Sequence, residues 1–208
     1  MFWALRLPGR AGIMGGMKDV MQAMEDWDAA GLRSAEAVLV GAQHSSPRQP
    51  GARLAVNENG AAAGAVSMGC VENDLREHML DLLRNGGAGK LLHYGAAFEA
   101  ALEVGLSCGG EIDVWIRRHD PQDAAWRAVL ELAPTDRALL LTRLDGDSEQ
   151  VLWRPGETPP APEMAGQLAD LWVRGGTDRI RTAAGRWFAE TLAPDPLLLI
   201  VGASPIAV

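Results

Sequence analysis

Three stretches of the sequence combine arginine or cysteine with glycine or proline, residue types that shape a loop around a ligand. The first contains Arg48 and Arg53 among several prolines, the second contains Cys70, and the third contains Cys108. A guanidinium matches a phosphate or carboxylate with two parallel hydrogen bonds, and a proline-stiffened loop loses little entropy on binding. The three stretches together predict one pocket for an anionic, sulfur-containing ligand.

Cys70 follows Gly69 at the expected start of a helix. Unpaired backbone amides at a helix start attract an anion, and the same position favours the thiolate form of a cysteine. The alternative is that Cys70 is a small residue packing the helix onto a sheet. For Arg48 and Arg53, the alternative is a solvated side chain or a pair with one of the many carboxylates.

Bulk properties exclude several classes of protein. The chain has 208 residues, a net charge of -8 and a pI near 5.0, which argues against nucleic-acid binding. The chain has two cysteines and no convincing signal peptide, which predicts a cytoplasmic protein. No apolar run approaches 18 residues, so no membrane span is expected. The four histidines show no ligand spacing around the cysteines, so no zinc site is expected, and a hydrolase triad of Ser45 with one of the histidines is not expected either.

Hydrophobic patterning predicts an α/β fold, a mixed sheet with flanking helices. Helices are expected from 17 to about 30, 70–85, 120–133 and 164–174, with a helical turn within 97–104. Asp120 is the expected cap of the third helix. Strands are expected at 35–42, 53–56, 61–67, 90–94, 111–117, 137–144 and 150–153, loosely within 180–192, and as a buried parallel strand at 197–201. Residues 1–16 are interpreted as an extension and residues 17–195 as the main domain.

Several motifs occur in a characteristic order. They are Ser46-Pro47-Arg48, Pro50-Gly51-Ala52-Arg53, Gly64-x-Val66-Ser67-x-Gly69-Cys70-Val71-Glu72, Tyr94-Gly95 and Glu103-Val104-Gly105-Leu106-x-Cys108-Gly109-Gly110-Glu111-Ile112. In order and spacing they resemble the XdhC/CoxI family, accessory proteins in the maturation of xanthine dehydrogenase and related molybdenum hydroxylases. The resemblance extends from about Met17 to the C-terminus, where residues 196–208 resemble the start of that family's Rossmann-type domain.

The resemblance implies a chaperone without turnover of its own. Family members bind the molybdenum cofactor (molybdopterin) as cargo, help it acquire its sulfido ligand and deliver it to the hydroxylase. The implied partners are a xanthine dehydrogenase-type hydroxylase, a cysteine desulfurase and the cofactor-biosynthesis proteins. The residues that would bind the cofactor are Ser46, Arg48, Arg53, Ser67, Gly69, Cys70, Glu72, Cys108, Gly109 and Gly110.

Two other functions stay open. The chain could be an interaction module that docks on the hydroxylase without cofactor, because Met68 replaces the family's usual glycine and is expected to crowd the turn beside Cys70. It could also be a fragment of a nucleotide-dependent oxidoreductase, because Gly202-Ala203-Ser204 follows an apolar strand in the position of a dinucleotide-binding fingerprint. An unpaired apolar strand at 197–201 would also allow a homodimer.

Overall fold

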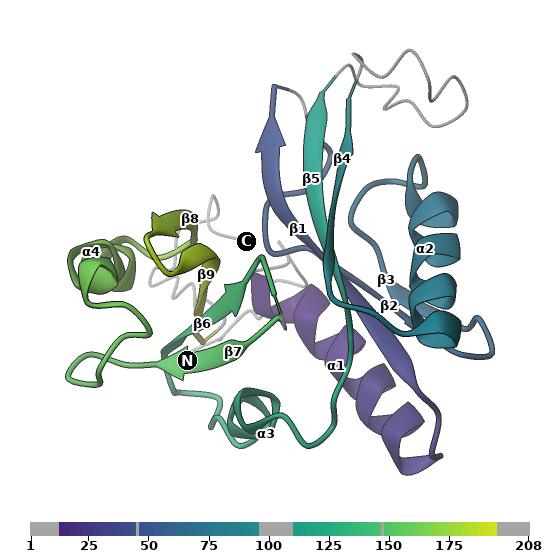
Figure 1. Cartoon of the computed structure of the whole chain (residues 1–208). Coiled ribbons are helices and arrows are strands. Elements are labelled where there is room, and N and C mark those ends of the chain that lie inside the picture. The colour runs from purple at the N-terminus through teal and green to yellow at the C-terminus, as the bar shows by residue number, and fades with distance from the viewer. Residues whose placement is uncertain (1–12, 45, 96–109, 147, 195–208) are drawn as a thin grey trace, which may run out of the picture.

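The strands form two antiparallel sheets in a computed structural model that describes residues 13–44, 46–95, 110–146 and 148–194 (Figure 1). The five-stranded sheet has the order β3-β2-β1-β5-β4 and comprises β1 (Ser34–Gln43), β2 (Arg53–Asn57), β3 (Ala62–Gly64), β4 (Lys90–Tyr94) and β5 (Glu111–Arg118). The four-stranded sheet has the order β7-β6-β9-β8 and comprises β6 (Ala138–Arg143), β7 (Gln150–Trp153), β8 (Thr177–Thr182) and β9 (Gly185–Leu192). The expectation of a mixed sheet is therefore wrong for the described strands, whose pairings are all antiparallel.

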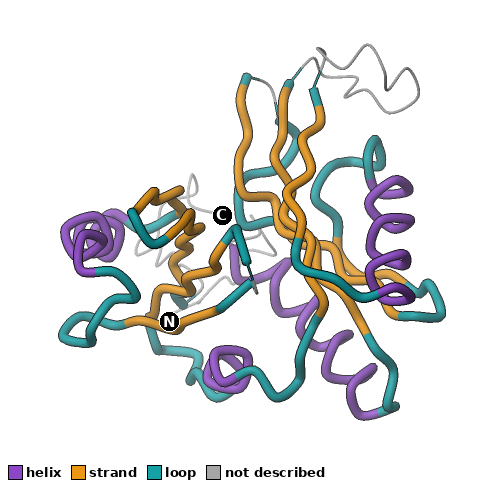
Figure 2. The backbone as a smooth tube through the Cα atoms, viewed as in Figure 1, coloured by secondary structure: helices purple, strands orange, loops and turns teal. Residues whose placement is uncertain are grey.

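The helices cover the outer faces of the two sheets and part of the space between them (Figure 2). They are α1 (Ile13–Ala29), α2 (Glu72–Asn85), α3 (Ala124–Leu130), a short 3-10 turn at Pro162–Met164, and α4 (Ala165–Arg174). Helix α2 buries Leu75, Met79 and Leu83 against the five-stranded sheet, as its sequence period predicts. Helix α4 packs on the outer side of the four-stranded sheet. Among the described helices, none has the length and apolar character needed to cross a membrane.

Two local predictions differ in detail from the structure. The strand expected within 180–192 is present as β9, and the same segment also includes the end of β8 and the tight turn of the β8–β9 hairpin, which ends at Gly185 with φ of 142°. The turn interrupts the alternation in the middle of the segment, which explains why its period is weak. The cap of α3 is Asp123 rather than Asp120, because Asp123 accepts hydrogen bonds from the amides of Ala125 and Trp126. The expected turn at 97–104 and strand at 197–201 lie outside the described residues.

Apolar side chains join the two sheets. This cluster consists of Val38, Val40, Trp115, Leu144 and Phe188. The alternation of strand side chains places residues such as Leu39 and Leu54 against α2 and their neighbours on the side of the four-stranded sheet. The strands β1 and β2 are therefore largely buried on both faces, with α2 on one side and the four-stranded sheet on the other.

A buried network of charged groups lies beside this cluster. Arg53 Nε donates to Glu36 Oε1 at 2.7 Å, and its Nη1 donates to Glu190 Oε2 of the other sheet at 2.8 Å. Arg117 Nε donates to Glu36 Oε2 at 3.1 Å, and its Nη2 donates to Gln150 of the other sheet at 2.6 Å. Burial raises the pKa of Glu36, but the two guanidinium groups outweigh it and hold that pKa at about 2. The network therefore links the sheets through ionised groups that are shielded from water.

Candidate functional site

The loop after β1 and the loop before α2 meet on the α2 side of the five-stranded sheet. Arg48 Nε donates to the carbonyl oxygen of Ser67 at 3.1 Å, and Ser46 Oγ donates to the carbonyl oxygen of Arg48 at 2.8 Å. Arg48 is exposed, so the remainder of its guanidinium faces solvent. The structure thus brings together the first two stretches that the sequence singles out.

The carboxylate of Glu72 occupies the centre of the second loop. It accepts hydrogen bonds from the amides of Val66, Ser67, Gly69 and Val71 at 2.7–3.3 Å, and from the Ser67 hydroxyl at 2.5 Å. Partial burial raises the pKa of Glu72, but the Ser67 hydroxyl and these amides lower it below its ordinary value. The amides that the sequence predicts as donors to an anion are therefore directed at a carboxylate of the chain itself.

We expect Glu72→Ala to loosen this loop. Four amides would lose their acceptor, at a cost of about 1–2 kcal/mol, part of which water at this half-buried site would offset. Hydrogen exchange of the Ser67 and Gly69 amides should accelerate, whereas Glu77→Ala, on the exposed side of the same helix, should leave it unchanged. Unchanged exchange in Glu72→Ala would mean that other contacts hold the loop.

Cys70 lies at the inner side of this loop and Met68 at its tip. Cys70 is partly buried and packs against the core beneath α2, and its amide donates to Ser67 Oγ at 3.2 Å. The side chain of Met68 is 79% exposed. Gly69 has φ of 105°, and a Cβ there would meet no atom within 4 Å. The expectation that Met68 crowds the turn is therefore wrong, because the loop directs Met68 into solvent.

Arg53 does not share this site. Because side chains alternate along β2, Leu54 faces α2 while Arg53 faces the second sheet, where it pairs with Glu36 and Glu190. Of the third stretch, Gly110 is buried just before β5, while Cys108 and Gly109 lie outside the described residues.

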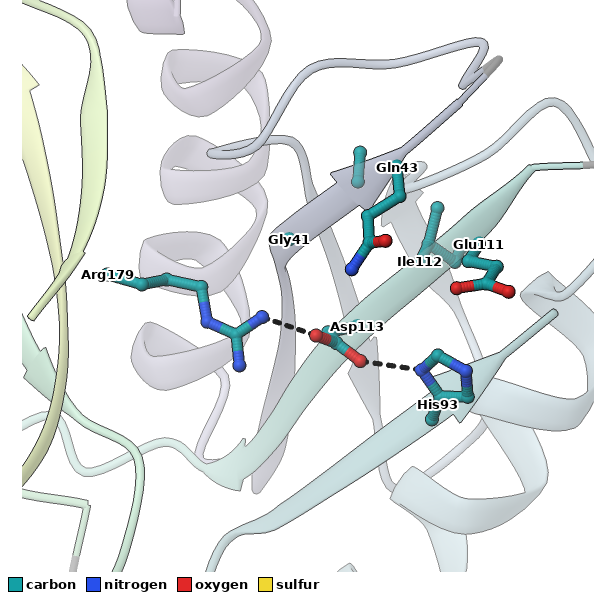
Figure 3. Close-up of a pocket in the computed structure, with 8 residues that line it drawn as sticks. Gly41, Gln43, His93, Glu111, Ile112, Asp113 and Arg179 are labelled. Carbon is teal, nitrogen blue, oxygen red and sulfur yellow. Dashed lines mark hydrogen bonds and ion pairs between the residues drawn. The ribbon is translucent and has the colours of Figure 1, made fainter. Parts of the chain in front are cut away.

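A small polar pocket lies on the opposite face of the five-stranded sheet, where β8 approaches the ends of β1, β4 and β5 (Figure 3). It has a volume of about 180 Å³. Its polar side chains are Gln43, His93, Glu111, Asp113 and Arg179. His93 Nδ1 lies 2.8 Å from Asp113 Oδ1, and Arg179 Nη1 donates to Asp113 Oδ2. The Asp113 carboxylate therefore binds the His93 imidazole through one oxygen and the Arg179 guanidinium, from the four-stranded sheet, through the other.

Two glycines make room for the acidic residues of this pocket. The register of β1 against β5 shifts between Leu39 and Gly41, which places Gly41 opposite Asp113. A Cβ at Gly41 would lie 2.7 Å from Arg179 Nη1, and one at Gly95 would lie 2.8 Å from Glu111 Cγ. Small residues at both positions therefore allow Arg179 and Glu111 to take the positions that they have.

Asp113 is the ionised acceptor at the centre of this pocket. Partial burial raises its pKa, but hydrogen bonds from His93 and Arg179 lower that pKa below its ordinary value, so Asp113 is ionised at neutral pH. An ionised carboxylate only accepts hydrogen bonds, so Nδ1 of His93 carries a proton. The His93 side chain is 46% exposed, so this pair lies at the mouth of the pocket.

Sequence reasoning missed this pocket. Ile112 and Val114 are correctly placed on one face of β5, so the alternation already put Asp113 on the other face. The usable signal is a titratable residue on each of two neighbouring strands, His93 on β4 and Asp113 on β5. Arg179 could not be anticipated, because it comes from the second sheet. Within the described residues, no group of three or more His, Cys, Asp and Glu side chains could hold a metal ion.

The fold and site define an α/β protein in which two antiparallel sheets are joined by buried ion pairs. Residues 27–95, which include β1, the two loops and α2, match the model of the XdhC and CoxI family, so this part of the chain is similar to that family. That family is linked to the maturation of xanthine dehydrogenase.

Among solved structures, the chain is similar to a Bacillus halodurans protein described as a xanthine dehydrogenase. The TM-score is 0.57 at 19% identity, and the match covers 85% of this chain and 53% of that one. The chain thus spans about half the length of that protein, and at this identity the similarity shows the fold alone. Among curated proteins, none matches the sequence.

Proposed function

We propose that the protein is a molybdenum-cofactor chaperone, which holds the cofactor as cargo, assists its sulfuration and passes it to a xanthine dehydrogenase-type hydroxylase. The observation that carries this proposal is the contact between Arg48 and the Ser67 carbonyl, which joins an exposed guanidinium to the loop that contains Cys70. Both loops lie within residues 27–95, the part of the chain that matches the family.

The chemistry of this surface suits the cargo in two respects. The cofactor carries a phosphate, which the solvent-facing part of the Arg48 guanidinium can bind by charge-assisted hydrogen bonds. It also carries sulfur ligands and a metal centre, beside which a thiol such as Cys70 can act in sulfur exchange. Because Glu72 already accepts the loop amides, Arg48 rather than the backbone is the anion-binding group in this proposal. A cysteine desulfurase and cofactor-biosynthesis proteins are the partners that such a chaperone requires.

The test is to purify the protein from cells that make molybdopterin, oxidise it and measure pterin fluorescence. Wild type should carry pterin, and Arg48→Ala should lower the amount about tenfold, because one charge-assisted contact is lost. Arg84→Ala, an exposed arginine in the last turn of α2, is the matched control and should carry as much pterin as wild type. Cys70→Ala should reduce retention or sulfuration more than Cys108→Ala. Wild type without pterin would reject the proposal.

A second candidate is an interaction module that docks on the hydroxylase without cofactor. The exposed side chain of Met68, at the tip of the loop, favours it. Large apolar side chains in contact with solvent are candidate contacts for a partner protein. In that case Met68→Ser would weaken binding to the apo-hydroxylase, and the purified protein would contain no pterin.

A further inference from the structure

The pocket formed by Gln43, His93, Glu111, Asp113 and Arg179 has a distinct balance of hydrogen-bonding groups. Asp113 is already satisfied, because His93 and Arg179 bind its two oxygens. Within the described parts of the chain, the side chains of Gln43 and Glu111 have no hydrogen-bond partner, although both line the pocket. The capacity of this pocket to bind a ligand therefore rests mainly on Gln43, Glu111 and the outer nitrogen of His93.

These groups are mostly acceptors. The two oxygens of Glu111 accept, and Nδ1 of His93 already contacts Asp113. The Gln43 amide offers one acceptor and a pair of donor hydrogens. Arg179 balances Asp113, and Glu111 adds a carboxylate, so the pocket favours a ligand that is rich in N–H donors.

Gln43 and Glu111 are direct cross-strand partners in the pairing of β1 with β5. Such partners have Cβ atoms about 5 Å apart on the same face of a sheet, so their polar ends can bind one edge of a planar ligand. A carboxylate takes two parallel N–H bonds from a ring N–H and an adjacent amino group, while a neighbouring amide N–H binds a ring carbonyl. Figure 3 shows Gln43 and Glu111 at the strand ends, with His93 nearby.

We propose that this pocket binds the 2-amino-4-oxopyrimidine edge of a fused heterocycle, the edge shared by guanine and pterin. Glu111 accepts from the ring N–H and the amino group, and the Gln43 amide donates to the carbonyl. The volume of about 180 Å³, room for about six water molecules, suits one ring system rather than a whole nucleotide or cofactor. The pterin source extends the proposed function and rests on it, whereas the guanine source does not.

The test titrates the full-length protein with pterin, lumazine, guanosine and inosine, followed by ligand or tryptophan fluorescence. Lumazine has a carbonyl and inosine a hydrogen in place of the 2-amino group, so each should bind at least tenfold more weakly than its amino counterpart. A higher affinity for pterin than for guanosine identifies pterin as the ligand, and a higher affinity for guanosine identifies a guanine nucleoside. Because these ligand pairs use unaltered protein, they test the proposal even where a variant fails to fold.

Glu111→Gln keeps the size of the side chain but replaces one acceptor oxygen with a donor, and we expect it to weaken pterin or guanosine binding at least tenfold. Glu77→Gln, exposed on α2, should bind like wild type. Failure of wild type to bind pterin and guanosine, or equal binding by Glu111→Gln, would overturn the assignment. If Glu111→Gln purified from cells retains all of its cofactor, the pterin source fails and the chaperone function stands. If wild type carries no cofactor but binds guanosine in a way that depends on Glu111, the pocket assignment stands and the chaperone function fails.

Discussion

Arg53→Ala should lower the free energy of unfolding by about 3–5 kcal/mol, because it leaves a fully buried carboxylate without its partner. Glu190 is 0% exposed, and among the described residues Arg53 is the cation that pairs with it. A loss of this size is a large fraction of the stability of an ordinary domain. Urea unfolding followed by tryptophan fluorescence would measure it.

Two further variants isolate the cause of this loss. Arg84→Ala removes an exposed arginine and should change the free energy of unfolding by less than about 0.5 kcal/mol. The double variant Arg53→Met with Glu190→Leu removes both charges and should recover most of the loss, while Glu36 keeps its contact with Arg117. A double variant as unstable as Arg53→Ala would show that lost packing, rather than the unpaired charge, is responsible.

Acid should lower the free energy of unfolding, because Glu36 becomes protonated. Its pKa is about 2 in the folded state, against an ordinary value of 4.5. Between these values the unfolded chain binds a proton that the folded protein does not, so the stability due to Glu36 is fully present above about pH 4.5 and is lost as pH falls through about 2. The expected loss is about 3 kcal/mol. Free energies of unfolding measured between pH 6 and pH 2 would show it.

Glu36→Gln separates this carboxylate from the others that titrate in the same range. The variant should be less stable than wild type at pH 6, and the difference should shrink by about 3 kcal/mol toward pH 2. Glu77→Gln, exposed on α2, should show no such convergence. A constant difference between wild type and Glu36→Gln across this range would mean that Glu36 does not keep its low pKa.

Local patterns predicted most of the elements. The apolar stripe of α2 and the alternation of β5 each follow from side chains near in sequence, and both are confirmed. The β8–β9 hairpin was missed, because its turn interrupts the alternation. For the candidate site, the glycine and cysteine types indicated a loop before α2. They could not show that Glu72 accepts the amides of that loop, because a side chain that folds back on its own loop leaves no periodic signal.

Which residues share a face of a strand follows from local alternation along the chain. Because side chains alternate along β2, Arg53 and Leu54 had to point to opposite sides. The partners on each face depend on tertiary packing. Arg53 pairs with Glu190, 137 positions away, and Asp113 pairs with Arg179, 66 positions away. Pairing between sheets depends on register and packing over such distances, which no local period encodes. For this reason an arginine expected to bind a ligand joins the two sheets, and a histidine without a metal-binding pattern lines a pocket.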